Sequence, residues 1–516
     1  MSTDSGEKRI GVIRLLLIGL WLAIVVAVPA LGVWAASSLA AYRNGPVQLV
    51  CAAGLLLFPV LPLLWEARAA RRRSRRHAAA SGSAAGAARS SQTLTFGDRL
   101  VLRTLALNLV FLAGVLALFP AFTFAALATR GDWFLDGRSG PRVDEARLHL
   151  FRLASRLEGL YARVRRNRFE GSLDPSARRL PEARPVPPPV APVPIERTVE
   201  AGSGAAIPGA PSAGWGVAGG EAAGRSLPWP LPATLHPVVA GLSPADETTL
   251  QAVARTIGAA ERDPWQRVKA LHDWVADRIA YDVDGYRAAV CPPQDAETVF
   301  RTRKAVCAGY ANLLAAMGNA IGEEIRVVPG DARQQSSDLT GSGHAWSAAR
   351  VSGRWVLIDT TWDAGTVGEG GFTKRYDTRY LFVPPAVIGV THFPEDEAWQ
   401  LREPPFSRGE FFRQPVLGAR FFAEGLVLVS PDRSQVTVEK DVTMTLGNPR
   451  GRSLLAHVEL ADGGTPMDCR VAAGPESRVH CVLPGRGRYR LKLFSAERRD
   501  ATHDFVGEIE VNATGG

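Results

Sequence analysis

The stretch GSGHAWSAARVSGRWVLIDTTWDAG, residues 341–365, decides the fold of the central part of this chain. Two runs of apolar character, residues 344–351 and 354–359, are separated by Ser352 and Gly353. Two such residues between strand-like runs are typical of a tight hairpin turn. We therefore predict two adjacent antiparallel strands with position 351 opposite 354.

This register would bring two potentially reactive side chains of the hairpin together. Position 346 then lies opposite 359, so His344 and Asp359 become diagonal neighbours on one face, within reach of each other's side chains. A carboxylate there can accept the imidazole N–H and stabilise an imidazolium, which leaves the other ring nitrogen for a nucleophile. An ordinary loop histidine and a turn-capping aspartate are the alternative. Asp363 is a weaker candidate for the same role.

Cys307 is the candidate nucleophile. It opens an apolar helical run that continues to Ile321, and a helix N-terminus favours a thiolate. A lone cysteine is more often a buried apolar residue, so the hypothesis depends on the imidazole of His344. Two amphipathic helical runs precede it, residues 243–257 and 264–279, and short β runs follow. Asp263 and Pro264 are typical of a helix cap and a first helical residue at the start of the second run. Helices followed by a sheet predict an α+β domain.

Acyl transfer through Cys307 would need donors for a developing oxyanion. The backbone N–H of Cys307 is the natural first donor. Gln294 could supply a second, although a solvated loop glutamine is an equally good interpretation. Trp346 and Trp362 flank the histidine and the aspartate, and we interpret both as packing that excludes water. Cys291 has no base near it in sequence and is interpreted as a structural thiol.

Four stretches of the sequence resemble the transglutaminase-like superfamily, and within it the kyphoscoliosis-peptidase-like branch. They are DPWQRVKALHDWVADRIAYD, RKAVCAGYANLL, the hairpin stretch, and YLFVPPAVIGVTHFPEDEAWQL, within residues 240–410. The resemblance implies a papain-like fold with Cys307 as nucleophile, His344 as general base and acid, and Asp359 as the orienting acid. Ala305, where a glycine is expected, and Arg402, in place of an aliphatic residue, depart from the pattern. Neither removes a catalytic group.

Residues 411–516 show short alternating runs separated by turn residues, among them residues 435–446, which we predict as one strand. This spacing predicts an all-β sandwich of immunoglobulin-like type. Within it, Cys469 and Cys481 flank Gly474-Pro475, so a hairpin centred on Pro475 would set the two cysteines opposite one another. We expect a disulfide if this domain lies in an oxidising compartment, and two buried thiols otherwise.

Three uncharged apolar runs, residues 15–41, 46–65 and 104–129, each reach the ~20 residues that a helix needs to cross a bilayer. The first run is too long for the apolar region of a cleaved signal peptide. The loop between the second and third runs contains many arginines. The positive-inside rule therefore places this loop in the cytoplasm. We therefore predict a three-span α-helical anchor over residues 1–130. The protein would be multi-pass, with its catalytic domain extracytoplasmic or periplasmic.

Between the anchor and the catalytic domain we expect a juxtamembrane helix at 131–168 and a Pro/Gly/Ala-rich disordered linker at 169–235. Residues 148–164 carry the 3,4 leucine spacing of a short coiled coil, which predicts weak dimerisation. A helix lying on the membrane surface explains the same pattern equally well. The catalytic domain is then expected at 236–410.

The net charge of +9 comes largely from arginines beside apolar runs, which favours membrane topology over nucleic-acid binding. The sequence has no zinc-type CxxC pair and no EF-hand spacing, so we expect no metal or cofactor and disfavour a calcium-dependent cross-linker. The first hypothesis is an anchored thiol enzyme acting on protein or peptide amides, with hydrolysis slightly favoured over amine transfer. The second is a catalytically silent scaffold that binds an envelope or cytoskeletal protein.

Overall fold

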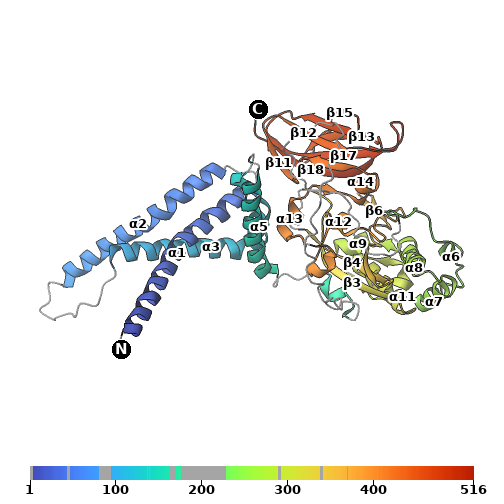
Figure 1. Cartoon of the computed structure of the whole chain (residues 1–516), viewed down its shortest axis with the longest axis horizontal. Helices are drawn as coiled ribbons and strands as arrows, with labels where there is room; N and C mark the ends of the chain where they lie inside the picture. The colour runs from blue at the N-terminus through green and yellow to red at the C-terminus, as the bar shows by residue number, and fades with distance from the viewer. Residues whose placement is uncertain are drawn as a thin grey trace, which may run out of the picture.

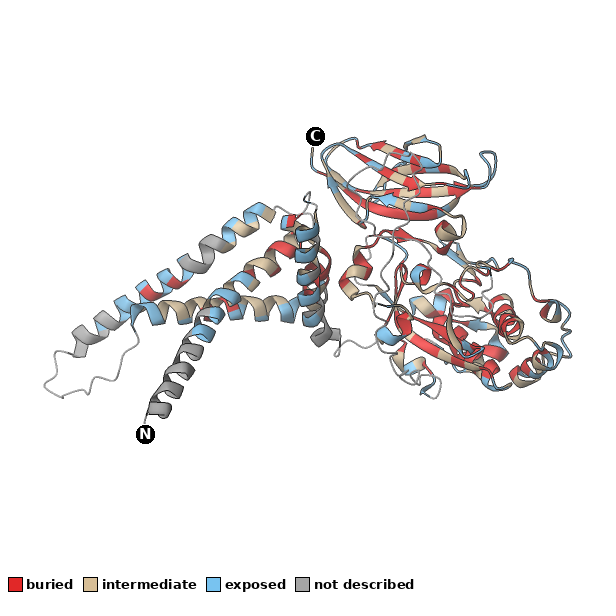
Figure 2. Ribbon diagram, in the orientation of Figure 1, coloured by how far each residue is buried: buried red, intermediate tan, exposed pale blue. Residues whose placement is uncertain are grey.

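The computed structural model describes residues 4–42, 47–80, 95–135, 138, 140–162, 169–175, 228–288, 292–336, 341–368, 370–403 and 405–515. A group of long helices forms one part, and a larger part holds the α+β region and a β-rich region (Figure 1). Buried residues concentrate in the larger part, whereas the long helices expose much of their surface (Figure 2).

Three long helices, α1 (Asp4–Tyr42), α2 (Val47–Ala80) and α3 (Phe96–Leu118), extend from a common end near α4 (Pro120–Arg130) and α5 (Pro141–Ala162) (Figure 1). Two of the described helical segments, Gly19–Tyr42 and Phe96–Leu118, are long and apolar enough to cross a membrane. The predicted second span lies on α2 and is not among them. Two candidate spans are therefore found where the sequence predicted three.

The prediction of one continuous span over residues 104–129 is wrong. The helix breaks at Phe119, whose φ of −137° is not helical, and Pro120 occupies the first turn of α4. Proline lacks the N–H that would continue the hydrogen bonding of α3 and disfavours helical dihedrals in the residue before it. At its other end α3 begins earlier than predicted, because Thr95 and Asp98 form a capping box.

The juxtamembrane helix α5 buries a different face from the one that the leucine spacing predicted. Phe151 and Ala154 are buried, whereas Leu153 is 44% exposed. The guanidinium of Arg413 lies 3.6 Å from the ring centroid of Phe151. The side chains of Leu157 and Leu160 lie outside the described residues. The described part of α5 thus packs within the chain through Phe151, and dimerisation through 148–164 stays a prediction.

The predicted linker, residues 169–235, begins and ends on the α+β domain that follows it. Phe169 and Leu173 flank the short 3-10 helix η2 (Glu170–Ser172) and are buried in the domain's main core, as is Leu231. Both ends of the predicted linker pack on the domain because burial removes the apolar surface of these side chains from water, which is favourable. Residues 176–227 of the predicted linker lie outside the described residues.

The α+β region places α11 (Cys307–Asn319) against a four-stranded sheet of order β5-β4-β3-β8. The strands of this sheet are β3 (Glu324–Ala332), β4 (Ser342–Val351), β5 (Arg354–Ile358) and β8 (His392–Pro394). The smaller elements are α6 (Pro237–Ala240), β1 (Ala280–Tyr281), α9 (Val283–Arg287), α10 (Ala296–Thr302), β2 (Lys304–Ala305), β6 (Gly365–Gly368), β7 (Gly371–Lys374) and α12 (Pro385–Ile388).

Two helices precede α11 on its other side, α7 (Leu250–Ala260) and α8 (Pro264–Arg278). The side chain of Asp263 caps α8, and Pro264 is its first residue, as the sequence indicated. Helix α7 starts later than the predicted residue 243, because Thr249 caps it instead.

The β4–β5 hairpin has the predicted register. Val351 pairs with Arg354, and Ser352 and Gly353 form the turn with φ of 50° and 79°. Both residues therefore adopt the left-handed conformation that a type I′ turn requires. Extending the ladder by one step beyond the pair of Ser347 with Ile358 sets Asp359 beside the part of β4 that holds His344.

The C-terminal region is β-rich and forms two sheets, β10-β12-β16-β15 and β11-β18-β17-β13-β14, the second extended by β9 on β18. The run predicted as one strand, residues 435–446, divides at the turn between β11 and β12, which enter different sheets. The immunoglobulin-like topology stays a prediction. The strands are β9 (Val416–Leu417), β10 (Val427–Ser430), β11 (Gln435–Val438), β12 (Asp441–Gly447), β13 (Ser453–Leu460), β14 (Met467–Asp468), β15 (Arg470–Ala472), β16 (Glu476–Val482), β17 (Gly487–Ala496) and β18 (Asp504–Ala513).

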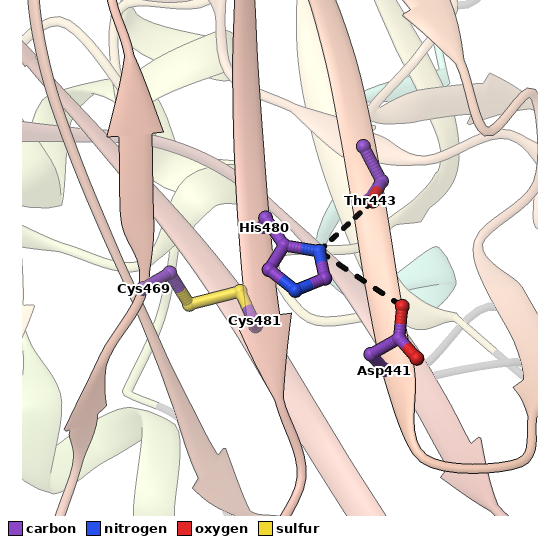
Figure 3. The surroundings of a disulfide bond; sticks show 5 residues. All are labelled: Asp441, Thr443, Cys469, His480 and Cys481. Carbon is purple, nitrogen blue, oxygen red and sulfur yellow. Dashed lines mark hydrogen bonds and ion pairs between the residues drawn. A yellow bond between two sulfur atoms is a disulfide. The ribbon is translucent and has the colours of Figure 1, made fainter.

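Cys469 and Cys481 form a disulfide in this region (Figure 3). Arg470 pairs with His480 across β15 and β16, so the two cysteines stand one step further along the same ladder. The imidazole of His480 points the other way, toward Thr443 on β12, with 3.2 Å between Nδ1 and the hydroxyl oxygen (Figure 3).

The helical part, α1 to α5, contacts the larger part through α13 (Arg408–Arg413), which precedes α14 (Ala419–Ala423). The buried carboxylate of Asp132 accepts hydrogen bonds from Arg147 at 3.2 Å and Arg433 at 2.8 Å. Gly409 lies so close to α4 that a Cβ atom there would stand 2.5 Å from the carbonyl oxygen of Ala128. The helical part is therefore held against the larger part by packing and charge.

Candidate active site

Cys307 is the first residue of α11 and is only 1% exposed. Its helix has no side-chain cap at Val306. The N–H of Val306 donates instead to Oε1 of Gln294 at 2.9 Å, which fixes the chain just before the cysteine. The first N–H groups of a helix lack an acceptor within the helix and carry partial positive charge. The thiol thus stands where a developing negative charge is favoured.

His344 on β4 and Asp359 after β5 form a direct pair. Nε2 of His344 lies 2.7 Å from Oδ2 of Asp359, and both side chains are buried. The side chain of Cys307 is an electrostatic neighbour of His344 and favours the charged imidazole, which raises the pKa of His344. Because Nε2 is committed to the carboxylate, Nδ1 is the ring atom that remains for the thiol.

Electrostatics favour the charged imidazole in this pair. Burial opposes the charged form of His344, but the carboxylate of Asp359 and the Cys307 side chain outweigh it and raise the pKa of His344 to about 10. For Asp359, burial would raise the pKa, yet the charge and hydrogen bond of His344 and the bond from His392 lower it. The arrangement therefore stabilises an imidazolium beside a carboxylate.

The backbone completes the environment of Asp359. Its second oxygen, Oδ1, accepts the N–H of Thr361 at 2.8 Å and of Trp362 at 3.1 Å. The turn after β5 therefore fixes the orientation of the Asp359 carboxylate, so that its Oδ2 faces the two imidazoles. Hydrogen bonds to the ionised form are what make such deep burial of a carboxylate tolerable.

A second histidine, which the sequence reasoning missed, shares Asp359. Nε2 of His392 on β8 lies 3.0 Å from the same Oδ2, and its Nδ1 lies 2.9 Å from the hydroxyl of Thr391. β8 reaches the site by pairing with β3. The signal available in the sequence was the motif VTHFPED, which lay inside a resembling stretch but far from the hairpin.

The ligand atoms of His344, Asp359 and His392 all lie within 4.8 Å of one another, so these three could hold a metal ion. Two imidazole nitrogens and a carboxylate oxygen are ligands that zinc accepts. In the described structure the same atoms make hydrogen bonds to one another, at distances that suit N–H···O contacts.

The other residues that the sequence singled out lie at different distances from His344. Trp346 and Trp362 flank His344, with ring centroids 6.0 Å and 5.9 Å from its imidazole. Gln294 is buried, and its Nε2 donates to the carbonyl of Pro292 at 2.8 Å. Asp363 does not approach His344. Cys291 lies outside the described residues.

Asp363 belongs to a second buried cluster around His272 on α8. Nε2 of His272 lies 3.1 Å from Asp363 and Nδ1 lies 3.0 Å from Asp273. Burial opposes protonation, but the two carboxylates raise the pKa of His272 to about 9. Burial also raises the pKa of Asp363, to about 6. The hydrogen bond from His272 to Asp363 connects α8 to the turn that begins at Asp359.

Comparison with known proteins defines the class of this part of the chain. Residues 251–360 match the family model described as "Transglutaminase-like superfamily". This segment, which includes Cys307, His344 and Asp359, is therefore a transglutaminase-like domain. The superfamily is one of thiol enzymes.

Among curated proteins the chain is similar to kyphoscoliosis peptidase of Mus musculus, with 32% identity over 238 residues, 45% of this chain and 36% of that protein. It is also 31% identical over 189 residues to kyphoscoliosis peptidase of Homo sapiens, covering 35% of this chain and 29% of that protein. The transglutaminase-like domain belongs to the kyphoscoliosis-peptidase-like branch. The chain spans about a third of the length of these relatives.

Among solved structures, a crystal structure of a TGase shares 19% identity over 23% of this chain and 34% of that one, with a TM-score of 0.20. At that score the likeness supports no inference about this chain.

Proposed function

We propose that this chain is a membrane-anchored thiol enzyme that acts on protein or peptide amides through an acyl-enzyme on Cys307. The observation that supports it is the run of contacts from Cys307 through His344 to Asp359, with the thiol at the start of α11. A charged imidazole beside the thiol favours the thiolate, which is the reactive form of cysteine.

In the first half of the reaction the Cys307 thiolate attacks the amide carbonyl carbon and forms a C–S bond. His344 gives its Nδ1 proton to the leaving nitrogen as the C–N bond breaks, and a thioester remains. In the second half, water or an amine attacks the thioester and gives a proton back to His344. The C–S bond breaks and the thiolate is restored. Asp359 holds the imidazole ring throughout.

The oxyanion formed at each step needs donors at a fixed position. The N–H of Cys307 at the start of α11 supplies the first in this proposal. Gln294 remains the proposed second donor, because only one hydrogen of its Nε2 is used by Pro292 and the side chain already contacts the chain before Cys307.

Hydrolysis is proposed over transfer to an amine by a small margin. The two curated relatives are named peptidases, and a peptidase uses water as the acceptor. Trp346 and Trp362 beside His344 would shield the thioester from bulk solvent, which disfavours water and keeps the margin small. An acceptor amine would have to pass the same side chains.

We further propose that the apolar segments of α1 and α3 insert into a membrane, and that α3 carries the chain across it so that the larger part lies on the extracytoplasmic side. The apolar segments of α1 and α3 support membrane insertion, and the arginines near residues 68–103 support a cytoplasmic loop. The Cys469–Cys481 pair is of the kind that persists outside the cytoplasm. A reporter fused after Gly516 should be active only on the outer side, and activity only in the cytoplasm would contradict this topology.

The second candidate is a silent scaffold that binds a protein partner. It is favoured by the burial of Cys307, which is 1% exposed, since a substrate carbonyl must reach a covered thiol. A scaffold would bind its partner equally well after Cys307→Ala, whereas an enzyme would lose turnover.

The test uses the full chain in detergent with fluorescein-labelled casein, and with a dansyl-labelled primary amine as the alternative acceptor. Peptide release should require Cys307 and disappear in Cys307→Ala. Cys51→Ala is the matched control, because Cys51 is the other free cysteine of the described residues. Equal release by the wild type and by Cys307→Ala would contradict the enzyme proposal. Incorporation of the amine without peptide release would change the acceptor from water to amine.

A further inference from the structure

One carboxylate oxygen in this site serves two imidazoles. Oδ2 of Asp359 lies 2.7 Å from Nε2 of His344 and 3.0 Å from Nε2 of His392. His392 is 2% exposed, and its ring lies against His344, Trp346 and Trp362 at centroid distances of 5.3, 5.1 and 4.4 Å. A buried histidine in direct contact with the orienting carboxylate is not needed by the mechanism above.

The hydrogen-bond partners settle how His392 is protonated. An ionised carboxylate only accepts, so Nε2 of His392 must carry the hydrogen that points at Asp359. Burial lowers the pKa of His392, and the charge of His344 lowers it further against the pull of Asp359. These effects favour the neutral ring, whose Nδ1 lies 2.9 Å from the hydroxyl oxygen of Thr391. The remaining titratable neighbour is Tyr380, with its ring centroid 5.7 Å away.

A second, neutral donor to Asp359 weakens the hydrogen bond between this carboxylate and the imidazolium of His344. The charge of Asp359 is shared between two N–H groups, so each hydrogen bond is weaker than it would be alone. His344 has to give its proton to the leaving amine, and a general acid works best when its pKa is not far above the working pH. An imidazolium held too firmly would favour the thiolate but delay the release of the amine.

We propose that His392 is a positioning residue that shares Oδ2 of Asp359 with His344 and so limits how firmly the carboxylate holds the His344 proton. This inference rests on the proposed function, in which His344 is the general acid. Oδ2 of Asp359 sets the tautomer of His392, because the carboxylate only accepts, and β8 brings the ring to the site through its pairing with β3.

The test compares His392→Leu, which removes the donor, with His392→Gln, whose amide N–H can replace it. His480→Leu is the matched control, because His480 also contacts a threonine hydroxyl but lies beside the disulfide in the β-rich region (Figure 3). All variants are full-length and in detergent. The titration of His344 is followed by NMR of 13C-labelled histidine in the Cys307→Ala background, and His344→Ala assigns its resonance.

His392→Leu should move the titration midpoint of His344 upward by about half a pH unit or more, and His392→Gln should restore it. With Cys307 present, kcat on casein should fall about tenfold in His392→Leu with KM unchanged, while alkylation of Cys307 by iodoacetamide at pH 6 is retained. His480→Leu should match the wild type in every measurement.

A midpoint that stays or falls in His392→Leu, or an equal effect of leucine and glutamine, would overturn the proposal. Parallel loss of alkylation and turnover in both variants would also overturn it and assign His392 a purely structural role. The titration needs no substrate. A shifted midpoint together with a wild type that releases no peptide from casein would therefore contradict the proposed function and leave the inference about His392 standing.

Discussion

Oδ2 of Asp359 lies 2.7 Å from Nε2 of His344, although the two residues belong to opposite sides of a hairpin turn. The pairing depends on the two left-handed residues of that turn, Ser352 and Gly353. An extra residue there would shift the register by one and turn one side chain to the other face of the sheet. The local chain geometry thus sets the chemistry of the site.

Asp359→Asn should nearly abolish amide turnover. The amide cannot stabilise an imidazolium by charge, and its NH2 group would face the donor nitrogens of His344 and His392. We expect kcat on labelled casein to fall about 10³-fold or more. Asp500→Asn, an exposed residue paired only with nearby Arg498 in the described structure, is the control and should change nothing. Turnover within a few-fold of wild type in Asp359→Asn would contradict the orienting role.

The buried cluster around His272 predicts a pH-dependent contribution to stability. The pKa of His272 is raised to about 9 in the folded protein, against the pressure of burial, by Asp273 and Asp363. Its stabilising effect is therefore complete below the unfolded-state pKa of about 6.5 and is lost as the pH rises through about 9.

His272→Gln should accordingly lower the free energy of unfolding by about 3 kcal/mol at pH 6 and by clearly less at pH 9.5. Urea unfolding of the full chain at the two pH values measures the difference. His503→Gln, which replaces a histidine at the surface of the β-rich region, is the control. A larger loss at pH 9.5 than at pH 6 would show that His272 is not held as an imidazolium.

The disulfide should stabilise the β-rich region without affecting the catalytic site. Its two cysteines are 12 residues apart, and closing a loop of that size is worth about 3 kcal/mol. The double variant Cys469→Ser with Cys481→Ser should unfold at lower urea and keep its turnover at 25 °C. Dithiothreitol should destabilise the wild type and leave the double variant unchanged. A wild type insensitive to the reductant would indicate that the pair is not oxidised.

Gly409→Ala should loosen the contact between the anchor and the larger part. The added methyl group would meet the backbone oxygen of Ala128, which cannot move aside as a flexible side chain could. Amide hydrogen exchange in α13 and α4 should become faster. Gly485→Ala has open space around its new methyl group and should exchange like the wild type. Unchanged exchange in Gly409→Ala would mean that α13 and α4 are not packed as described.

The positions of Cys307, His344 and Asp359 in the fold could be predicted from the sequence because each depends on local chain geometry, whereas their catalytic roles stay a proposal. A helix start places Cys307, and one tight turn places the other two. The same reasoning predicted α8 from Asp263 and Pro264, since a cap and a proline at N1 act within one turn of helix.

The residues that the sequence did not reveal depend on long-range packing. His392 is 33 residues from Asp359 and reaches it only because β8 pairs with β3. The burial of Phe169 was missed because its neighbours in sequence are polar, while its partners belong to the distant core. The helix break at Phe119 was the exception. Pro120 was visible in the sequence, but the apolar run outweighed it in the prediction.

The rate of Cys307 alkylation by iodoacetamide against pH, in the wild type and in His344→Ala, tests the thiolate–imidazolium pair most directly. The account predicts rapid alkylation of the wild type at pH ~5–6 and its loss in the variant. Alkylation that becomes rapid only near the ordinary thiol range of pH ~8.5, and is the same in both proteins, would contradict the enzyme proposal and favour the scaffold.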